Sequence, residues 1–340
     1  MRKSYIFLVL LLFTAGIAGY SQSRSDKNPV TYEELYDEPY AINKLFVQFQ
    51  PLYGEMFVTN VNAGFGLEVS YYMADKFDFR VHARKTYAKQ FDLTRDIADK
   101  NSNVDNLPNT YNYYELGATY HVKDFDESSK TKMFLYKKSY RGDKWASRVP
   151  LSVEIPCKVR KIYGVRLGGL YFDTAIDVNR ALKSQDQTSA ILVDADGNTI
   201  SSATSEPDDL SIFGNMQVAG GYVGGSMTWI KNVAVDFDNK YVEGVDDLIL
   251  TAFLDILVGA PTIDDIVYNG TPYSSDGLET SMIGFRLGLD GKFNRTLSWG
   301  YGAEVGTRPG LKGRGFYALV KISFPIYSTN LDYSVEAFGK

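Results

Sequence analysis

Apolar and polar side chains alternate along the stretch from Phe77 to Lys85. In an extended chain one face carries Phe77, Phe79, Val81 and Ala83, and the other carries Asp78, Arg80, His82 and Arg84. A strand of a soluble protein with one solvent-exposed face can alternate in the same way, so one instance does not distinguish a soluble sheet from a membrane barrel. The pattern recurs over most of the chain, however, with charged residues or glycine opposite the apolar face. Behind an export signal, this recurrence is typical of strands that face lipid on one side, and it predicts a transmembrane β-barrel.

The first 21 residues are typical of a secretory signal. Arg2 and Lys3 precede an apolar run over residues 5–18, and residues 19–21 supply the small side chains that a signal peptidase reads. This run falls short of the roughly 20 residues that a spanning helix needs. We therefore expect cleavage before Gln22 rather than a retained anchor. No cysteine follows the run directly, so no lipoprotein anchor is expected.

Composition excludes several other classes of protein. No second apolar run approaches the length of a membrane helix and mean hydropathy is −0.21, which excludes a helical membrane protein but leaves a barrel open. Cys157 is the one cysteine, so no intrachain disulfide can form. The net charge is −5 and no basic block is present, so no nucleic-acid partner is expected. Aromatic residues make up 14% of the chain, which suits strands and interfacial girdles.

The alternating segments predict 12 to 14 antiparallel strands of roughly 9–11 residues each. We favour 14, because an even count returns both ends to one side. The segments include 111–123, 130–138, 151–157, 163–171, 233–238 and a short strand near 263–268, while 248–258 could be a strand or a short helix. Short turns are expected at 74–76, 231–232 and 292–296, and long loops at 89–110, 174–210 and 259–280. Short periplasmic turns with long extracellular loops are typical of outer-membrane barrels.

This pattern resembles the outer-membrane β-barrel proteins of Gram-negative bacteria, and Gln22 after the cleavage site is similar to exported proteins of the Bacteroidota. The resemblance implies a place in the cell outer membrane, with lipid and other outer-membrane proteins as partners. It implies a periplasmic N-terminal segment over 22–43, either a loosely docked lead-in or a short plug, and a barrel over 44–325. Such barrels usually end on an aromatic residue of the closing strand. Here residues 325–340 follow Phe324, so 326–340 is either a periplasmic tail or contains the closing strand at 331–338.

The polar faces predict a charged lumen. The candidate lumen-lining residues are Asp78, Arg80, His82, Arg84, Glu115, His121, Lys123, Arg166, Asp236, Asp238, Arg286, Asp290, Glu304 and Lys321, with Glu154 and Asp255 expected on the same surface. Opposed charges line the constriction of a water-filled pore, and they also pair across closed barrels as a rigid polar core. The outward band should include Phe79, Val81, Leu167, Val235, Phe285 and Val320.

The two histidines are the first candidates for chemistry. His82 and His121, with Asp78 and Glu115 nearby, could form a metal or acid–base group, but two imidazoles alone favour a hydrogen-bonded lumen network. Outer-membrane phospholipases place a histidine and a serine two residues apart, and neither histidine here has that serine. We expect no metal and no cofactor.

Two acidic groups complete the candidates for chemistry. Barrel proteases pair acids with a histidine, which is absent in sequence near Asp236 and Asp238. The stretch 194–198 is similar to a calcium loop, but its glycine is fourth rather than sixth, which favours a turn. An enzyme is therefore not expected.

Two functions follow from this interpretation. The first is a porin-like channel or transporter for small polar solutes. The second is a non-conducting barrel that serves as a scaffold or subunit of an outer-membrane secretion or assembly complex. A soluble exported sandwich is a third possibility, but it would leave Trp299, Tyr301 and Phe316 on an outward face without a partner.

Overall fold

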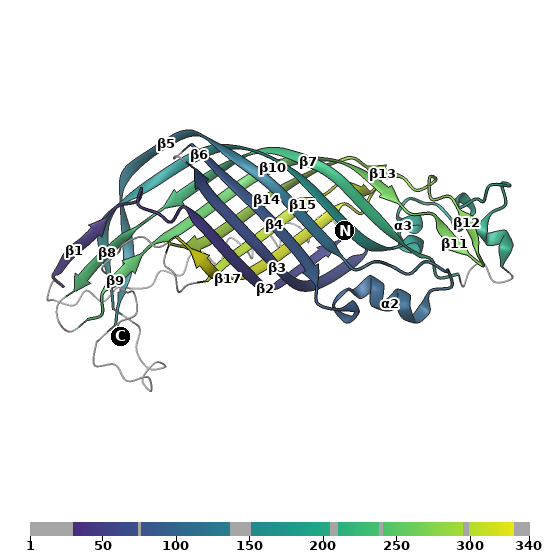
Figure 1. Cartoon of the computed structure of the whole chain (residues 1–340), viewed down its shortest axis with the longest axis horizontal. Coiled ribbons are helices and arrows are strands. Elements are labelled where there is room, and N and C mark those ends of the chain that lie inside the picture. The colour runs from purple at the N-terminus through teal and green to yellow at the C-terminus, as the bar shows by residue number, and fades with distance from the viewer. Residues whose placement is uncertain are drawn as a thin grey trace, which may run out of the picture.

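The alternation of apolar and polar residues produces one closed antiparallel β-barrel, drawn in Figure 1. The structure is a computed structural model, and it describes residues 30–73, 76–136, 151–204, 210–237, 241–294 and 299–329. The barrel strands in this part of the chain are β2 (Leu45–Phe57), β3 (Asn60–Met73), β4 (Phe77–Thr86), β5 (Asn112–Leu135), β6 (Leu151–Asp177), β7 (Phe213–Ile230), β10 (Leu248–Ile263), β14 (Ile283–Phe293), β15 (Gly300–Thr307) and β17 (Phe316–Ser328). Each strand pairs with the next one, and β17 pairs with β2 to close the barrel.

The expected count of 12 to 14 strands is too high, since ten strands close the barrel within the described residues. Segments 111–123 and 130–138 belong to the single strand β5, because its pairing with β6 continues through the charged residues between them. Segments 151–157 and 163–171 merge into β6 in the same way. The predicted strands near 233 and 263 lie outside the barrel, as β8 (Val233–Phe237) and β11 (Ile266–Tyr268). Residues 248–258 belong to strand β10 rather than to a helix.

The three long connections meet at one end of the barrel, which we call the loop end. This end carries η1 (Lys89–Phe91), α2 (Leu93–Asn101), α3 (Val178–Ser184), η3 (Ser189–Ile191), η4 (Ile200–Ala203), β11, β12 (Thr271–Tyr273), β13 (Thr280–Ser281) and β16 (Gly310–Leu311). The backbone of Asn103 donates to Ser211 O at 3.1 Å, and that of Asp105 donates to Val267 O at 2.7 Å. The loops therefore pack on one another, at the right of Figure 1.

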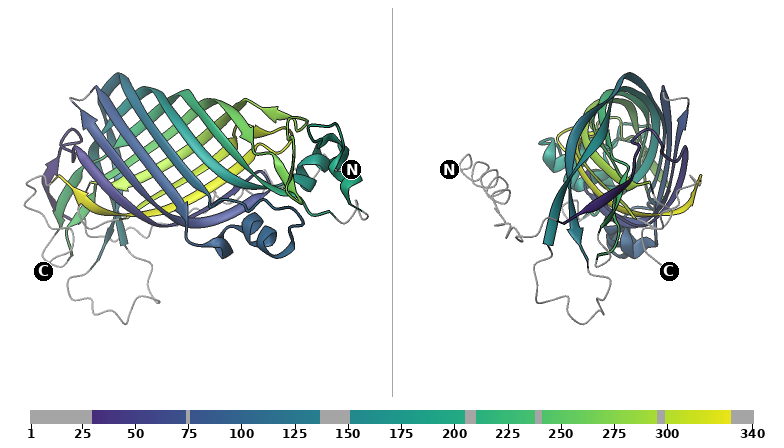
Figure 2. Two further views of the ribbon diagram at one scale, coloured as in Figure 1. Left: turned by 45° about the vertical axis from the view of Figure 1, so that its right-hand side comes forward. Right: turned by 90° about the vertical axis from the view of Figure 1, so that its left-hand side faces the viewer.

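The opposite end, where β2 begins and β17 ends, we call the terminal end. Here β1 (Tyr32–Asp37) pairs with β8, which pairs with β9 (Gly244–Asp246), so the turn at 231–232 leads into this small sheet rather than into the next barrel strand. The far parts of β5 and β6 extend beyond the barrel as a two-stranded ribbon, seen in the right view of Figure 2. Ribbon and sheet enclose an apolar cluster of Met133, Leu135, Ile155, Cys157, Val159, Val233, Val235 and Phe237.

The segment that joins β1 to β2 runs across the mouth of the barrel at this end. Asn232 Nδ2 donates to Glu38 O at 2.9 Å and to Ala41 O at 2.8 Å, and the backbone of Asn43 donates to Asn294 Oδ1 at 2.7 Å. Ile42 packs in an apolar cluster with Phe46, Ile162, Ile230 and Ile249. From Val30 onward the N-terminal segment is thus a strand followed by a strap over the mouth. Residues 331–338, considered above as a closing strand, lie outside the described residues.

The outer face of the barrel is apolar. Phe79, Val81, Leu167, Phe285 and Val320 are 36% to 66% exposed, as expected of outward residues. Val235 is an exception to the prediction, because β8 buries it at the terminal end.

Aromatic rings on the outer face gather at two levels. Tyr114 stacks near Tyr171 toward the loop end, and Phe77 contacts Tyr120 toward the terminal end. Within the described residues, no helix combines the length and the hydropathy that crossing a membrane requires.

Candidate functional site

Glycines on the inner wall make room for two aromatic rings. A Cβ atom at Gly117 would lie 2.0 Å from Tyr222 Oη, and one at Gly168 would lie 2.5 Å from Tyr222 Cζ. A Cβ at Gly288 would lie 2.1 Å from the ring of Phe253. Both rings therefore lie flat against the wall, and each offers its face to the lumen.

Arginine side chains stack on these two rings. Arg286 Cζ lies 4.4 Å from the centroid of Tyr222, and Arg166 Cζ lies 4.0 Å from that of Phe253. Such stacking leaves the edges of both guanidinium groups free to donate hydrogen bonds within the plane.

Arg286 is the centre of a buried ion network that crosses the lumen. Its Nη2 and Nη1 donate to the two carboxylate oxygens of Glu115 at 2.6 and 2.8 Å, and its Nε donates to Asp255 at 2.8 Å. Arg166 Nε donates to the other oxygen of Asp255 at 3.0 Å, and Tyr113 Oη donates to Glu115 at 2.6 Å. Strands β5, β6, β10 and β14 are therefore joined through their inward side chains.

A second group of charges lies on β3, β4, β14 and β17. Lys321 Nζ donates to Glu68 at 2.8 Å and lies 2.9 Å from Asp290, and Arg80 donates to Asp290 at 2.6 Å. Gln50 Nε2 donates to Glu68 at 3.1 Å. Opposite charges thus meet in pairs rather than on facing walls of an open pore.

A third group lies toward the loop end. Arg308 donates to Glu55 at 3.0 Å, Tyr111 Oη donates to the same carboxylate at 2.6 Å, and Tyr317 Oη donates to Glu304 at 3.1 Å. Arg308 Cζ lies 3.8 Å from the centroid of the Tyr317 ring. This group borders the apolar part of the interior.

The two histidines lie in different parts of these groups. His121 Nε2 is 3.3 Å from Asp78 Oδ2, whereas His82 Nε2 is 3.5 Å from Glu68 Oε1. They do not share a ligand set, and no group of three or more His, Cys, Asp or Glu side chains suited to a metal occurs in the described ranges. The stretch 194–198 forms a turn, in which Gly197 has a φ of 85° and Asp194 accepts from two backbone amides.

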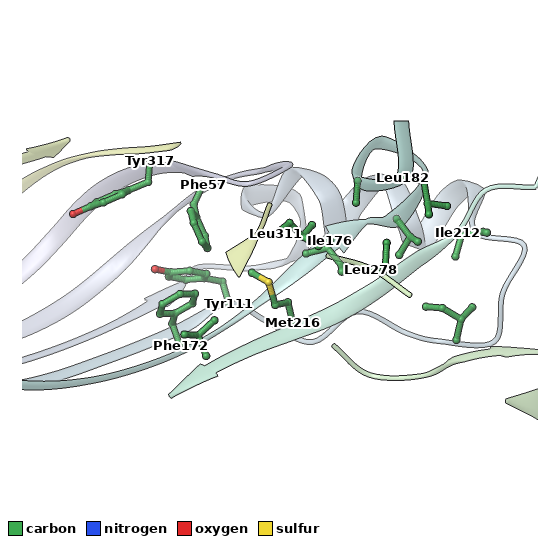
Figure 3. Packing of buried hydrophobic residues seen from close by; sticks show 14 of the residues in the cluster. Phe57, Tyr111, Phe172, Ile176, Leu182, Ile212, Met216, Leu278, Leu311 and Tyr317 are labelled. Carbon is green, nitrogen blue, oxygen red and sulfur yellow. The ribbon is translucent and has the colours of Figure 1, made fainter. Parts of the chain in front are cut away.

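An apolar cluster fills the interior at the loop end, as Figure 3 shows. Phe57 and Phe172 meet edge to face at 5.3 Å between centroids, and both are fully buried. Leu182 of α3 and Ile212 before β7 extend the cluster into the loops. The loops are therefore anchored by a continuous core with the barrel wall.

Little free volume remains among the charges. A cavity of about 10 Å³ is lined by Gln48, Glu68, Arg80, Ile249, Thr251, Asp290, Gly291, Lys292, Tyr301, Lys321 and Ser323. This volume admits roughly one water molecule. Around this cavity the side chains leave no larger space.

Most of the predicted lumen residues lie inside the barrel. They are Asp78, Arg80, His82, Arg84, Glu115, His121, Arg166, Asp255, Arg286, Asp290, Glu304 and Lys321. Arg84 is buried with its Cζ 3.9 Å from the centroid of the Tyr113 ring, and it makes no salt bridge to a described residue.

Four predicted lumen positions need correction or fall outside the description. Lys123 is exposed on the outer face, because a bulge between His121 and Lys123 shifts the alternation and aligns Lys123 with outward Tyr163. Asp236 lies on β8 outside the barrel, and Glu154 is exposed on the ribbon. Asp238 lies outside the described residues.

Sequence reasoning missed three charged residues of the network. Glu68 alternates with the outward Leu67 and Val69 on β3, so the alternation could have identified it. Glu55 follows Pro51, where the register shifts and the phase of β2 changes. Arg308 lies one residue beyond β15 and continues the inward phase of Glu304 and Gly306, so the alternation could have identified it as well.

No protein-family model matches the chain, and no curated protein matches it. Solved structures with some similarity include OprB of Pseudomonas putida at high pH, with 11% identity, 87% of this chain and 94% of that chain covered, and a TM-score of 0.18. The CymD monoaromatic hydrocarbon channel has 8% identity, coverage of 87% and 94%, and a TM-score of 0.19. A loop-deletion mutant of OmpT, an outer membrane protein of Vibrio cholerae, has 10% identity, coverage of 84% and 99%, and a TM-score of 0.17. TM-scores this low do not establish a shared fold.

Proposed function

We propose that this protein is an outer-membrane β-barrel with a sealed lumen, which acts as a non-conducting scaffold or subunit of an outer-membrane complex. The apolar outer face with aromatic rings at two levels supports a membrane location, because it matches a lipid-facing band with interfacial girdles. Export through a signal cleaved before Gln22 belongs to the same proposal.

The observation that carries the sealed lumen is the bridge of Arg286 to Glu115 and Asp255. These bonds join strands from different parts of the wall, and each of the three residues is at most 4% exposed. The apolar cluster at the loop end and the strap at the terminal end close the interior on either side. A solute would have to displace all three layers. Catalysis is not part of the proposed function, because the charged groups around Arg286 are paired with one another.

A porin-like channel is the second candidate, and the mixture of charges in the lumen favours it. Opposed charges such as Arg80 and Asp290 are the groups that select solutes in a pore once water separates them. A channel would therefore require a rearranged state in which these pairs separate.

Planar-bilayer conductance of the intact protein separates the two candidates. If the inserted protein passes no current, the sealed barrel is supported. Stepwise currents that scale with the salt concentration would overturn the sealed barrel in favour of the channel. The variant Arg286→Met with Glu115→Gln serves as the comparison, because it removes the central bridge without leaving an unpaired charge. If currents appear in this variant alone, the ion network is the seal.

Site-specific photo-crosslinking in the native envelope tests the scaffold role. Phe134 on the ribbon is 48% exposed beyond the barrel, and Phe285 on the outer band is 51% exposed. We expect protein adducts from position 134 and lipid adducts from position 285. Absence of protein adducts at both positions, and at exposed loop positions such as Leu107, would contradict a scaffold.

A further inference from the structure

The segment from Tyr87 to α2 presents an exposed apolar surface on the outside of the barrel. Tyr87, Phe91 and Leu93 are 46%, 51% and 46% exposed. In all three views of Figures 1 and 2, α2 lies below the outline of the barrel wall rather than across its mouth. These side chains are therefore on the outside, although the segment belongs to the loop end.

This surface continues the lipid-facing band. Phe65 points outward from β3 and its ring lies 5.6 Å from that of Tyr87, which lies 5.5 Å from that of Phe91. Ile97 follows Leu93 by four residues, so the two side chains share one face of the helix. The apolar surface thus passes without a break from strand β3 to α2.

Hydrogen bonds on its other side hold the segment in this position. Asp92 accepts from Asn60 Nδ2 at 2.8 Å and from the amide of Tyr111 at 3.3 Å, and Thr94 Oγ1 donates to Thr59 O at 2.9 Å. Asp92 and Thr94 are buried, as is Ala98 one turn later. The helix is therefore fixed with one face toward the protein and its apolar flank outward.

Basic residues border the apolar surface. Lys85 is exposed on the outward face of β4, paired with Phe65 on one neighbouring strand and with Asn112 on the other. Lys89, Arg95 and Lys100 follow along η1 and α2. Lys89 pairs with Asp99 and Lys100 with the partly buried Asp96, so the excess positive charge of this stretch comes from Lys85 and Arg95. Apolar groups toward the bilayer and excess positive charge above them are typical of a segment lying in a membrane interface.

We propose that residues 85–101 form a docking surface for anionic lipid headgroups, with Tyr87, Phe91, Leu93 and Ile97 in the upper acyl layer. This inference rests on the proposed membrane location, and it assigns the loop-end leaflet a specific lipid contact. A protein partner fits less well, because the surface has no boundary against the lipid-facing band.

Hydrogen exchange of the mature protein in nanodiscs tests this surface. Discs of phosphatidylglycerol and of phosphatidylcholine are compared, and peptides covering 87–101 should exchange more slowly in phosphatidylglycerol. The variant Lys85→Gln with Lys100→Gln should lose this difference, by roughly fivefold in exchange rate per lysine. The variant Phe91→Ser with Leu93→Ser should lose protection in both lipids. Lys183→Gln, at an exposed position on α3, is the matched control and should change nothing.

Peptides from β10 and β14 separate the two proposals. If they are protected in both discs while 87–101 exchanges alike in both lipids, the headgroup site is overturned and the membrane barrel stands. An unchanged lipid difference in the double lysine variant also overturns the site. If the protein does not insert into discs at all, both proposals fail.

Discussion

The interior of the barrel has two halves that are filled by opposite chemistry. In the middle, the inward residues are charged and are paired across the lumen around Arg286. Toward the loop end, the inward residues are aromatic and aliphatic, with Phe57 and Phe172 in contact and no exposure. Both halves come from strands with the same alternation. Alternation therefore decides which residues point inward, and it leaves open whether they form an ionic or an apolar core.

The two halves should also differ in how they respond to mutation. Burying ions is costly unless every charge finds a partner, so the ionic half depends on the completeness of its pairs. The apolar half depends on volume and contact, so it should lose stability in proportion to the cavity that a substitution leaves.

The largest effect is expected from Arg286→Ala. It leaves Glu115 without its bidentate partner in a buried site, which should lower the free energy of unfolding by about 3–5 kcal/mol. Urea unfolding in detergent micelles, followed by tryptophan fluorescence, measures this loss. The double variant Arg286→Met with Glu115→Gln should recover most of it, since Asp255 keeps Arg166. If the single and double variants are equally unstable, the ionic half is not governed by pairing.

A slightly smaller effect is expected from Phe172→Ala in the apolar half. The side chain is fully buried against Phe57 and stacks at 6.2 Å from Tyr113, so its removal should cost about 3 kcal/mol through the cavity that it leaves. The same unfolding measurement applies. Phe316→Ala is the control, because this phenylalanine is 52% exposed on the outer face. Equal losses for the two variants would argue against a packed interior at this level.

The boundary between wall and network can be probed with two adjacent glycines. A methyl group at Gly168 would lie 2.5 Å from the ring of Tyr222 and 2.6 Å from the backbone oxygen of Leu116, whereas one at Gly169 would lie 3.7 Å from the nearest atom, Gly220 O. Gly168→Ala should therefore displace Tyr222 from beneath Arg286 and cost about 1–3 kcal/mol. Gly169→Ala should leave stability nearly unchanged. If Gly168→Ala leaves the free energy of unfolding unchanged, Tyr222 does not support the network.

The sequence predicts the inward set well where the strands are regular. Arg80, His82 and Arg84 alternate on β4, and all three lie inside. Lys123 fails because one bulged residue changes the phase, and a bulge leaves no clear signal in the side-chain pattern. The strand count fails because charges over 124–130 are typical of a loop, although backbone pairing with β6 continues through them.

The pairs within the network could not be predicted at all. Arg286 and Glu115 are separated by 171 residues, and they meet only because the barrel has a particular circumference and register. Neither quantity follows from alternation. The outward position of α2 was likewise beyond reach, since it depends on the burial of Asp92 against Asn60, two residues of a loop and a strand end.

The smallest effect is expected from an exposed charge in the loops, where neither half of the interior is touched. Asp194 Oδ1 accepts from the amides of Asp196 and Asn198, and the hydrogen bond from the Asn198 side chain lowers the pKa of the Asp194 carboxyl. A lowered pKa in the folded state means that the ionised carboxylate stabilises the turn, so this contribution is present above about pH 4 and is lost as the pH falls through the folded-state pKa.

Asp194→Ala should therefore speed hydrogen exchange at the amides of Asp196 and Asn198 while the midpoint of global unfolding stays unchanged. The control is Asp196→Ala, which removes the same charge from the same turn but keeps the accepting carboxylate of Asp194. If both variants speed exchange equally, loss of charge rather than loss of the acceptor is responsible. Asp194→Ala could instead lower the free energy of unfolding as much as Arg286→Ala is expected to. Charges in the loops and charges in the lumen would then contribute equally to stability, which would contradict the contrast between exposed charges and paired interior ions.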